Sequence, residues 1–551
     1  MHVRIVGGGL AGSEAAWQVA SRGVRVTLSE MRPLRPTAVH HTDRLAELVC
    51  SNSFRGDKLD NAVGLLKEEM RRLGSLVMRA AEASRVPAGA ALAVDRDRFA
   101  QIVTSELANH PLVTIVRDEV QTIPDSSERE PVIVATGPLT SDALSTAIAS
   151  LVGSEHLYFY DAISPIVLAE TIDRGKVFRA SRWNRSLSRA QPRADQVRLR
   201  PDTTTDGHNP SSAAASGADG TRDSRHRLNA GDRRGGRSDP DDARREVGAV
   251  RLQPDLGEAD GVPLHPDLAC GVDDGEGDYL NCPMTRDEYQ TFYDALVHAE
   301  SATIHDFDRE RFFEGCLPIE VMAHRGGETL RFGPMKPVGL TDPRTGRTPY
   351  AVVQLRQDNL AGDHFSLVGF QTQLKWSEQA RVLRLIPGLE QAEFIRFGMV
   401  HRNTYVNGPE VLTETWQVRR RPTLFFAGQM SGVEGYVESA ASGLIAGLNA
   451  AALVAGRPAS SPPRTTAIGA LAYYASHADP RHYEPSNITF GIMPPLDPAP
   501  RGKLERKLAL SARALEALDQ WMRGPAFEGS GLEVSVSPET GSGQRPIEAS
   551  K

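Results

Sequence analysis

The sequence predicts an α/β fold, and three observations support that prediction. The chain opens with a short apolar strand from His2 to Val6, followed by the glycine turn GGGLAG and the helical segment SEAAWQVASRG. A second strand, VRVTLSE, ends at Glu30. Two later segments, VIVATG and FFAGQMSGVEGYVESAASG, again lead a buried strand into a glycine turn. These patterns are typical of a Rossmann-like domain with a parallel sheet.

The first glycine turn predicts a dinucleotide site. Its glycines allow a tight turn and let a pyrophosphate approach the N-terminus of the following helix. Glu30, at the end of the next strand, can accept a hydrogen bond from a ribose hydroxyl. A turn that binds nothing is the alternative, and the flanking strand, helix and acid argue against it. The predicted cofactor residues are Gly7, Gly8, Gly9, Leu10, Ala11, Gly12 and Glu30.

The two later segments favour FAD over NAD as the dinucleotide. The strand before Gly137 and the segment containing Gly428 and Gly435 resemble the second and last segments of flavoproteins. Because the first and last segments must meet in space, one flavin domain encloses an inserted domain. The predicted fold is therefore an FAD-binding Rossmann-like domain, of the glutathione-reductase-like flavoprotein type, with an inserted α+β domain.

Composition sets the predicted domain boundaries. A segment at 186–276 is rich in Gly, Ser, Asp and Arg and nearly lacks aromatic residues, so it cannot bury enough apolar surface to offset its ordering entropy. We expect it to be disordered. The predicted parts are the first FAD-binding part (1–180), the inserted domain (181–372), the second FAD-binding part (373–455), a helical tail (456–525) and a disordered end (526–551).

Bulk composition restricts the function classes. The chain has 551 residues with 40% hydrophobic content, enough for several domains with a sizeable core. Lys and Arg number 63 against 70 Asp and Glu, a net charge of -7, so any RNA must use a local basic patch. The N-terminus does not resemble a signal peptide, and no run of about 18 apolar residues occurs. We therefore expect a cytoplasmic protein and no membrane partner.

Four cysteines show no CxxC pairing, so the sequence predicts no metal site and no dithiol motif. Cys50 lies in the polar stretch CSNSFRGD. Cys282 lies in DYLNCPM, interpreted as a turn before a helix that starts near Thr285, and that helix N-terminus would favour a thiolate. An inert packing cysteine is the alternative. Cys270 and Cys316 are given no functional role.

The stretch FGMVHRNTYVNGPEVL carries a polar cluster next to the last flavin segment. His401, Asn403 and Tyr405 in it suit a flat heteroaromatic ligand through stacking and edge hydrogen bonds. A hydrogen-bonded loop histidine is the alternative. Basic residues that suit a polyanion are scattered, and most such residues are solvated faces. They are Arg331, Lys336, Arg344, Arg347, Lys375, Arg419, Arg420 and Arg421.

Many motifs together resemble one family. ELVCSNSFR, NAVGLLKEEMR, FRASR, DYLNCPM, GPMKPVGL, VGFQTQLKWSEQ, HRNTY, FAGQMSGVEGYVESAASG and NITFGIMPPL are similar to the folate- and FAD-dependent tRNA (uracil-5-)-methyltransferase, or TrmFO, family, which is related to the MnmG family. The resemblance covers nearly all the chain outside 186–276 and the C-terminal end. It implies FAD, reduction by NAD(P)H, 5,10-methylenetetrahydrofolate as carbon donor, and uridine 54 in the T-arm of tRNA as substrate.

The resemblance also implies roles for two thiols. Cys282 would add to C6 of uracil, which makes C5 nucleophilic, and Cys50 would be the second functional thiol near the flavin. The C5 proton must then leave to a base, and the uridine must be flipped out of its loop. One departure from the family is the long segment 186–276 before Cys282. Two rival functions remain open: an FAD-dependent NAD(P)H oxidoreductase acting on a small molecule, and a catalytically impaired tRNA-binding flavoprotein.

Overall fold

The computed structural model describes residues 1–37, 39–153, 157–184, 277–302 and 317–524. The two segments predicted to be disordered, 186–276 and 526–551, lie outside the described residues, as do Cys270 and Cys316.

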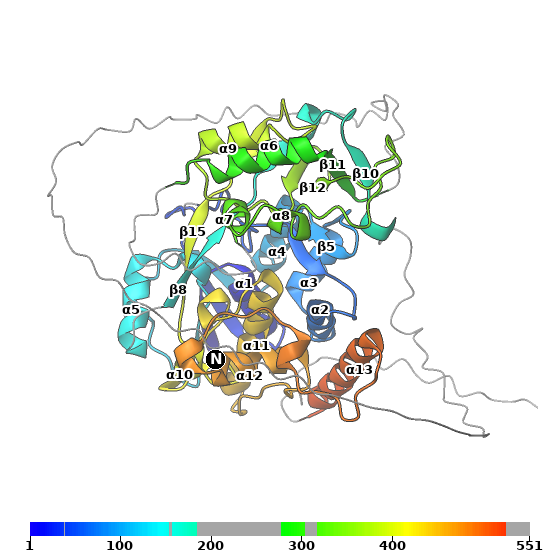
Figure 1. The fold of residues 1–551 in the computed structure, drawn as a ribbon. Helices are drawn as coiled ribbons and strands as arrows, with labels where there is room; N and C mark the ends of the chain where they lie inside the picture. Colours follow the sequence, from blue (N-terminus) through cyan, green and yellow to red (C-terminus); the bar gives the residue numbers. More distant parts are fainter. Residues whose placement is uncertain (38, 154–156, 185–276, 303–316, 525–551) are drawn as a thin grey trace, which may run out of the picture. The chain divides into compact units, whose positions relative to one another are not determined.

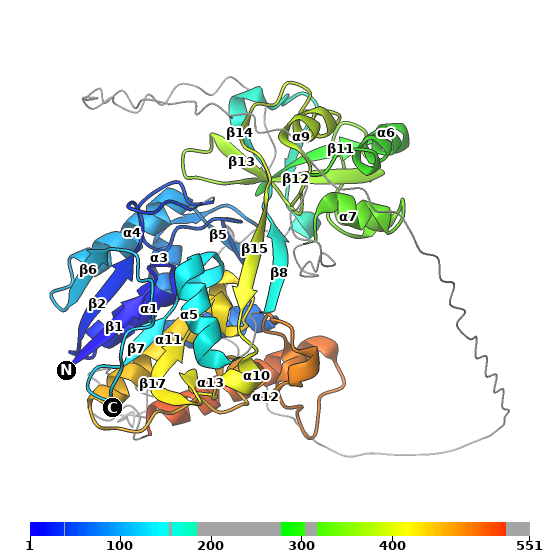
Figure 2. The same cartoon turned by 90° about the vertical axis from the view of Figure 1, so that its left-hand side faces the viewer.

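The first sheet is the predicted nucleotide-binding sheet, and its fold class is confirmed. In the described part of the chain it has the strand order β16-β17-β7-β1-β2-β6 (Figure 2). All neighbours pair in parallel except β16, which pairs antiparallel with β17. The order reverses between β1 and β7, and ligands of such sheets bind at that switch point, beyond the carboxyl ends of the strands. The strands are β1 (His2–Val6), β2 (Arg25–Glu30), β6 (Val113–Arg117), β7 (Val132–Val134), β16 (Gln417–Val418) and β17 (Arg421–Phe426).

Two helices from opposite ends of the chain, α1 (Leu10–Ala20) and α11 (Tyr436–Val454), pack closely against each other. A Cβ added to Gly443 of α11 would lie 2.1 Å from the carbonyl oxygen of Ala11, so only glycine fits there. Among the described helices, α11 alone has the length and hydropathy to span a membrane, and 89% of that window is buried inside the protein. Helix α11 is therefore a core helix of the protein.

Further helices and a small antiparallel sheet complete the part of the protein that contains the nucleotide-binding sheet (Figure 1). They are α2 (Ala62–Arg72), α3 (Leu76–Ala83), α4 (Arg96–Ala108), α5 (Asp142–Val152), α10 (Gly408–Val411), α12 (Ala467–His477), α13 (Lys503–Met522), β3 (Ser53–Gly56), β4 (Arg85–Val86) and β5 (Ala91–Val94).

A second sheet, antiparallel throughout its described strands, has the order β10-β11-β12-β13-β9-β14. It draws strands from 166 to 396, so this sheet is wider than the predicted inserted domain, 181–372. Three short strands, β9, β10 and β14, lie outside those limits. The elements are β9 (Ile166–Leu168), β10 (Phe178–Ala180), β11 (Tyr279–Met284), β12 (Ala351–Gln357), β13 (His364–Leu367), β14 (Phe394–Arg396), α6 (Arg286–Val297), α7 (Ile319–His324), α8 (Thr329–Phe332) and α9 (Trp376–Leu383).

The interpretation of DYLNCPM as a turn is wrong. Residues Tyr279–Met284 form the strand β11, because alternate residues Leu280, Cys282 and Met284 join one apolar core. The helix predicted after it begins as expected, since Thr285 caps α6 with a capping box.

The two sheets are connected by an antiparallel ribbon of β8 (Leu157–Ala162) and β15 (Val400–Tyr405) (Figure 2). Along the chain, β8 follows the first part of the nucleotide-binding sheet, and β15 precedes its last strands. The chain therefore enters and leaves the second sheet through one paired ribbon, which brings the segments on either side of it together.

The contact between α1 and α11 gives a first prediction. Gly443→Ala should destabilise the protein by about 1–2 kcal/mol in urea unfolding, because the added methyl group overpacks the contact with Ala11. We expect this net loss of stability even though the higher helix propensity of Ala favours the variant by about 1 kcal/mol. Gly327→Ala is the matched control, since its Cβ would meet only Tyr293, at 3.8 Å. Equal stability of the two variants would contradict the packing argument.

Candidate cofactor cleft and cysteine loop

A cleft of about 1030 Å³ lies beyond the carboxyl ends of β1, β2 and β7. Its lining includes eight of the predicted cofactor residues, namely Gly7, Gly8, Gly9, Leu10, Ala11, Glu30, Gly137 and Gly428. Gly12 supports the turn from behind, since a Cβ there would lie 1.8 Å from the carbonyl oxygen of Gly7. Gly435 is not among the lining residues; its φ of 112° lets the chain turn into α11 beside Glu438.

The cleft has the features that a dinucleotide needs. No protein atom lies within 4 Å of the position that a Cβ would take at Gly9 or Gly137, so a ligand can approach the backbone there. Gly9 is also the N-cap of α1, and no side chain caps that helix. The N–H groups of its first turn are suited to a pyrophosphate, and the helix dipole favours negative charge at that end.

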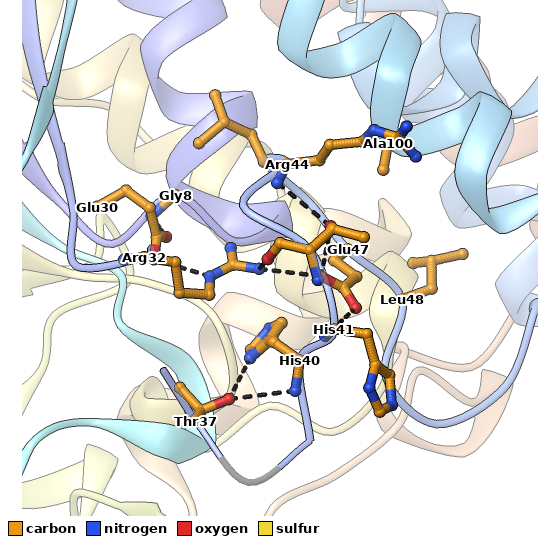
Figure 3. Close-up of polar contacts among 12 residues, drawn as sticks. Gly8, Glu30, Arg32, Thr37, His40, His41, Arg44, Glu47, Leu48 and Ala100 are labelled. Atoms are coloured by element: carbon orange, nitrogen blue, oxygen red, sulfur yellow. Dashed lines mark hydrogen bonds and ion pairs between the residues drawn. The ribbon is translucent and has the colours of Figure 1, made fainter. Parts of the chain in front are cut away.

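Glu30 is held by a buried ion-pair network at one side of the cleft (Figure 3). One carboxylate oxygen accepts from the Gly8 N–H at 2.9 Å, and the other accepts from the backbone and guanidinium of Arg32 at 3.0 and 2.9 Å. Burial raises the pKa of Glu30, but these hydrogen bonds and the Arg32 charge outweigh it, so the net pKa is below the usual value. Glu30 is therefore an anion, aligned for further hydrogen bonds.

Arg32 extends this network to a second acid, Glu47, at 3.1 Å (Figure 3). Glu47 also accepts from the backbone N–H groups of His41 and Thr42. These bonds lower its pKa despite burial. His40 lines the cleft, and burial together with the Arg32 charge lowers its pKa to about 4, so it is neutral near pH 7. The sequence signal for this network is the segment EMRP, which begins at Glu30 and includes Arg32.

The loop carrying Cys50 borders the cleft. Its neighbour Val49 lines the cleft, as does Tyr436 at the start of α11. The Tyr436 hydroxyl accepts from the backbone N–H groups of Cys50 and Ser51, at 2.7 and 3.1 Å. Cys50 is half-buried. The sequence-predicted thiol therefore lies next to the nucleotide cleft.

Three arginines from separate elements hold the same loop. Arg96 donates to the carbonyl oxygens of Leu48 and Cys50, at 2.7 and 3.2 Å. Arg396 donates to the Cys50 carbonyl at 3.0 Å, and burial with the nearby Arg96 charge lowers the pKa of Arg396 to about 10. Sequence reasoning did not single out these residues.

Arg356, on β12, binds the next two residues of the loop. Its guanidinium donates to the Asn52 side chain at 2.7 Å and to the Ser51 hydroxyl at 2.8 Å. Among the described residues, Asp358 is the acid that forms an ion pair with these arginines, at 2.9 Å from Arg96. Positive charge therefore predominates around the loop and favours anionic groups beside Cys50.

Cys282 lies in different surroundings. It is fully buried with Leu280 and Met284 in the apolar core of the second sheet. Its neighbour Asn281 points to the other face, where it accepts from Gln354 at 2.9 Å. Burial raises the pKa of the Cys282 thiol, and the nearby Glu390 charge raises it further. The expectation that a helix terminus makes this thiol acidic is therefore wrong, because desolvation dominates.

The remaining predicted ligand residues lie on the ribbon. His401 and Asn403 belong to β15 and pair in register with Asp161 and Phe159 of β8. Tyr405, at the end of the same strand, is buried and packs against Tyr483 with ring centroids 6.2 Å apart. The roles of these residues with folate or uracil stay predictions.

Several of the basic residues noted in the sequence are engaged within the fold. Arg331 lies over the Tyr350 ring, 3.6 Å from its centroid. Arg344 pairs with Asp342 at 2.9 Å. Lys375 pairs with Glu300 at 2.6 Å. These contacts reduce the charge that those positions offer to a polyanion.

The fold and the cleft define an FAD-binding, Rossmann-like protein with a second antiparallel sheet. Its fold is similar to that of Aquifex aeolicus GidA, with a TM-score of 0.56 at 15% identity over 94% of this chain and 73% of that chain. The family model described as glucose inhibited division protein A matches residues 2–205 and 269–458.

Comparison with known proteins identifies the family. The chain is 49% identical to the methylenetetrahydrofolate--tRNA-(uracil-5-)-methyltransferase TrmFO of Pelotomaculum thermopropionicum, over 94% of this chain and 98% of that protein. It is 51% identical to the protein of the same name from Desulforudis audaxviator, over 94% and 98%. The chain belongs to the TrmFO family, as its motifs predicted.

The contrast between the two thiols gives a second prediction. With iodoacetamide at pH 8, Cys50 in the native protein should react at least about tenfold faster than Cys282, because Cys282 is buried and its raised pKa disfavours the thiolate. Peptide mass spectrometry after timed quenching measures both rates. In urea the two rates should converge. Rapid native labelling of Cys282 would contradict its placement in the core.

A third prediction concerns Arg32→Met, which leaves two buried carboxylates without their cation. At pH 7 the variant should be less stable than the wild type by about 3 kcal/mol in urea unfolding. The pKa values of Glu30 and Glu47 are lowered by folding, so their contribution is present above the ordinary value of 4.5 and disappears as the pH falls through the folded values. The difference between the proteins should therefore shrink on acidification below about pH 4.5. A pH-independent difference would contradict this assignment.

Proposed function

We propose that this chain methylates C5 of a uridine in the T-arm of tRNA, at position 54. FAD, reduced by NAD(P)H, and 5,10-methylenetetrahydrofolate as carbon donor take part in the reaction. The main support is the cysteine loop, which borders the nucleotide cleft and is held by Arg96 of α4 and by Arg356 and Arg396 of the second sheet. Two relatives that are methylenetetrahydrofolate--tRNA-(uracil-5-)-methyltransferases by name, at 49% and 51% identity over nearly their whole length, support the same reaction. A tRNA-modifying enzyme is expected in the cytoplasm.

The residues of the cleft fit FAD. The N-terminus of α1 and the turn Gly7–Gly9 suit the pyrophosphate, and Glu30 suits the ribose. Gly137 and Gly428 allow close approach of the flavin end. When bound, the cofactor supplies redox and one-carbon chemistry that no side chain provides. The protein contributes binding, orientation and shielding from water.

Methylation at C5 requires a thiolate to add to C6 of the uracil, because C5 alone is a poor nucleophile. The addition places negative charge on the uracil oxygen, and C5 then attacks the electrophilic carbon. A base removes the C5 proton and the carrier leaves the one-carbon unit. A hydride, which the reduced flavin would supply, completes the methyl group, and the thiolate then leaves from C6. Positive charge from Arg96, Arg356 and Arg396 suits the anionic stage of such a reaction.

The surroundings of the two thiols support Cys50 as the thiol that meets the substrate. Cys50 is half-buried beside the cleft, and Tyr436 fixes its backbone. The role of Cys282 as nucleophile stays a prediction and requires β11 to open the apolar core around its sulfur. The rival function, a small-molecule oxidoreductase, would use the two cysteines as a redox pair. That pairing finds no support, because Cys282 lies in the core of the second sheet whereas the Cys50 loop borders the cleft.

The ends of the long segment before Cys282 argue against an impaired enzyme. Ser181 and Asp278 exchange two hydrogen bonds of 2.9 Å, between Ser181 Oγ and both the Asp278 carboxylate and its backbone N–H. Next to them, Ala180 pairs with Tyr279 in the ladder of β10 and β11. The chain thus leaves and re-enters the sheet at one place, and the register that positions Asn281 and Cys282 is complete.

A fourth prediction tests the function. Purified protein incubated with unmodified tRNA, NADPH and 5,10-methylenetetrahydrofolate should form 5-methyluridine at position 54, measured by nucleoside mass spectrometry of tRNA fragments. A tRNA with cytidine at that position is the substrate control. Cys50→Ala should lose product by at least about a thousandfold, the range expected for a nucleophile or its base. NADPH oxidation without tRNA should remain.

Tests with 5-fluorouridine tRNA separate the two thiols. The fluorine blocks release of the C5 substituent, so the protein stays bound through the attacking sulfur. We expect the adduct in wild type and in Cys282→Ala, and its absence in Cys50→Ala. An adduct lost only in Cys282→Ala would instead make the buried thiol the nucleophile. Failure of the wild type to form any 5-methyluridine would refute the proposed function.

A further inference from the structure

Three aromatic rings form a continuous stack: Trp376 at the start of α9, Phe394 in β14, and Phe397 directly after β14. The Trp376 and Phe397 rings have centroids 6.0 Å apart with an interplanar angle of 17°. Phe397 and Phe394 follow at 5.1 Å and 21°. Such near-parallel stacking over three rings gives one flat aromatic column. We call it the aromatic stack, defined by Trp376, Phe397 and Phe394.

The aromatic stack leads from the core to the surface. Phe394 packs against the hydrophobic core of the second sheet, and the Arg384 guanidinium lies 5.9 Å from its centroid. Trp376, at the other end, has 61% of its surface exposed. Trp376 therefore offers a large, flat apolar surface at the exposed end of the stack, which a planar ligand can stack on.

The aromatic stack is held rigidly by one buried side chain. Gln379 accepts from the Gly398 N–H at 2.7 Å and donates to the Gly398 and Leu374 carbonyls at 2.8 and 2.6 Å. Gly398 follows Phe397, and Leu374 lies two residues before Trp376. Gln379 thereby ties the backbone next to the middle ring, Phe397, to the backbone just before Trp376. A ligand that stacks on Trp376 therefore loses little entropy to side-chain ordering.

The surface around Trp376 is close to neutral. Lys375 pairs with Glu300 at 2.6 Å, and Arg381 pairs with Glu378 at 2.6 Å. The site therefore offers a flat apolar face more than a charge field. A nucleobase suits such a face, because every base has an aromatic plane and stacks without needing a counter-charge.

The aromatic stack also adjoins the cysteine loop along the chain. Arg396, directly before Phe397, donates to the Cys50 carbonyl oxygen at 3.0 Å. One short segment therefore carries both a contact to the loop and the middle ring of the stack. Trp376 is not among the residues that line the nucleotide cleft.

We propose that Trp376 is a stacking platform for an unpaired base of the tRNA substrate, a base other than the uridine that is methylated. This inference rests on the proposed function. Extracting one uridine from its loop unstacks its neighbours, and an exposed aromatic face replaces the lost stacking. Trp376 stacks on Phe397, and the residue directly before Phe397, Arg396, contacts the Cys50 loop.

A fifth prediction tests the platform in the full-length holoenzyme. Trp376→Ala should raise the KM and the Kd for tRNA about tenfold, within the range that loss of one stacking aromatic produces. Trp376→Phe should stay within about threefold of wild type, because a ring remains. KM for methylenetetrahydrofolate, flavin content and NADPH oxidation without tRNA should not change. Filter binding and initial rates over tRNA concentration measure these quantities.

Two controls make the result decisive. Phe332→Ala removes another aromatic side chain, 78% exposed, and should leave tRNA binding unchanged. In wild-type protein, hydroxyl-radical footprinting should show Trp376 protected by tRNA, a measurement that does not depend on a variant that folds. Unchanged tRNA affinity in Trp376→Ala overturns the inference while the wild type still makes 5-methyluridine. A change only in folate KM, or only in oligomeric state by light scattering, also overturns it, in favour of a folate subsite or a contact between copies.

Discussion

The convergence of three guanidinium groups on one short loop is the constraint on which the site depends. Arg96 comes from the nucleotide-binding unit, whereas Arg356 and Arg396 come from the second sheet. Each binds the backbone or a polar side chain of the loop around Cys50. Buried guanidinium groups are expensive to desolvate, and here that cost is met by hydrogen bonds to fixed carbonyl and side-chain oxygens. The loop cannot shift without breaking contacts to α4 and to the second sheet.

A second network ties the same loop to the nucleotide cleft. Arg32 lies between Glu30, at the end of β2, and Glu47, three residues before Cys50. The carboxylate that suits the ribose and the segment that leads into the cysteine loop therefore share one cation. Tyr436 adds a third link, since it lines the cleft and accepts from the Cys50 backbone. The position of the thiol is thus set by the same groups that shape the cofactor cleft.

Much of this arrangement follows from local sequence patterns, and the rest depends on distant contacts. The glycine spacing and the acid at a strand end are local signals, and they correctly led to Gly7, Gly9 and Glu30 at the cleft. A polar setting around Cys50 was equally readable. Arg396 meets the Cys50 carbonyl across 346 residues, and no short pattern carries such information. Cys282 was misinterpreted because a proline and a following helix suggested a turn, whereas strand alternation decided its burial.

The paired ends at Ser181 and Asp278 have a consequence for how this family can vary. Two hydrogen bonds and a strand ladder close the sheet at that point, so the intervening sequence needs only to begin and finish there. The entropic cost of closing a loop grows slowly with its length, so a longer connection between these two residues lowers the stability of the fold only slightly. The connection between Ser181 and Asp278 therefore tolerates inserted sequence. A reporter or an affinity module could be inserted into the enzyme at this position.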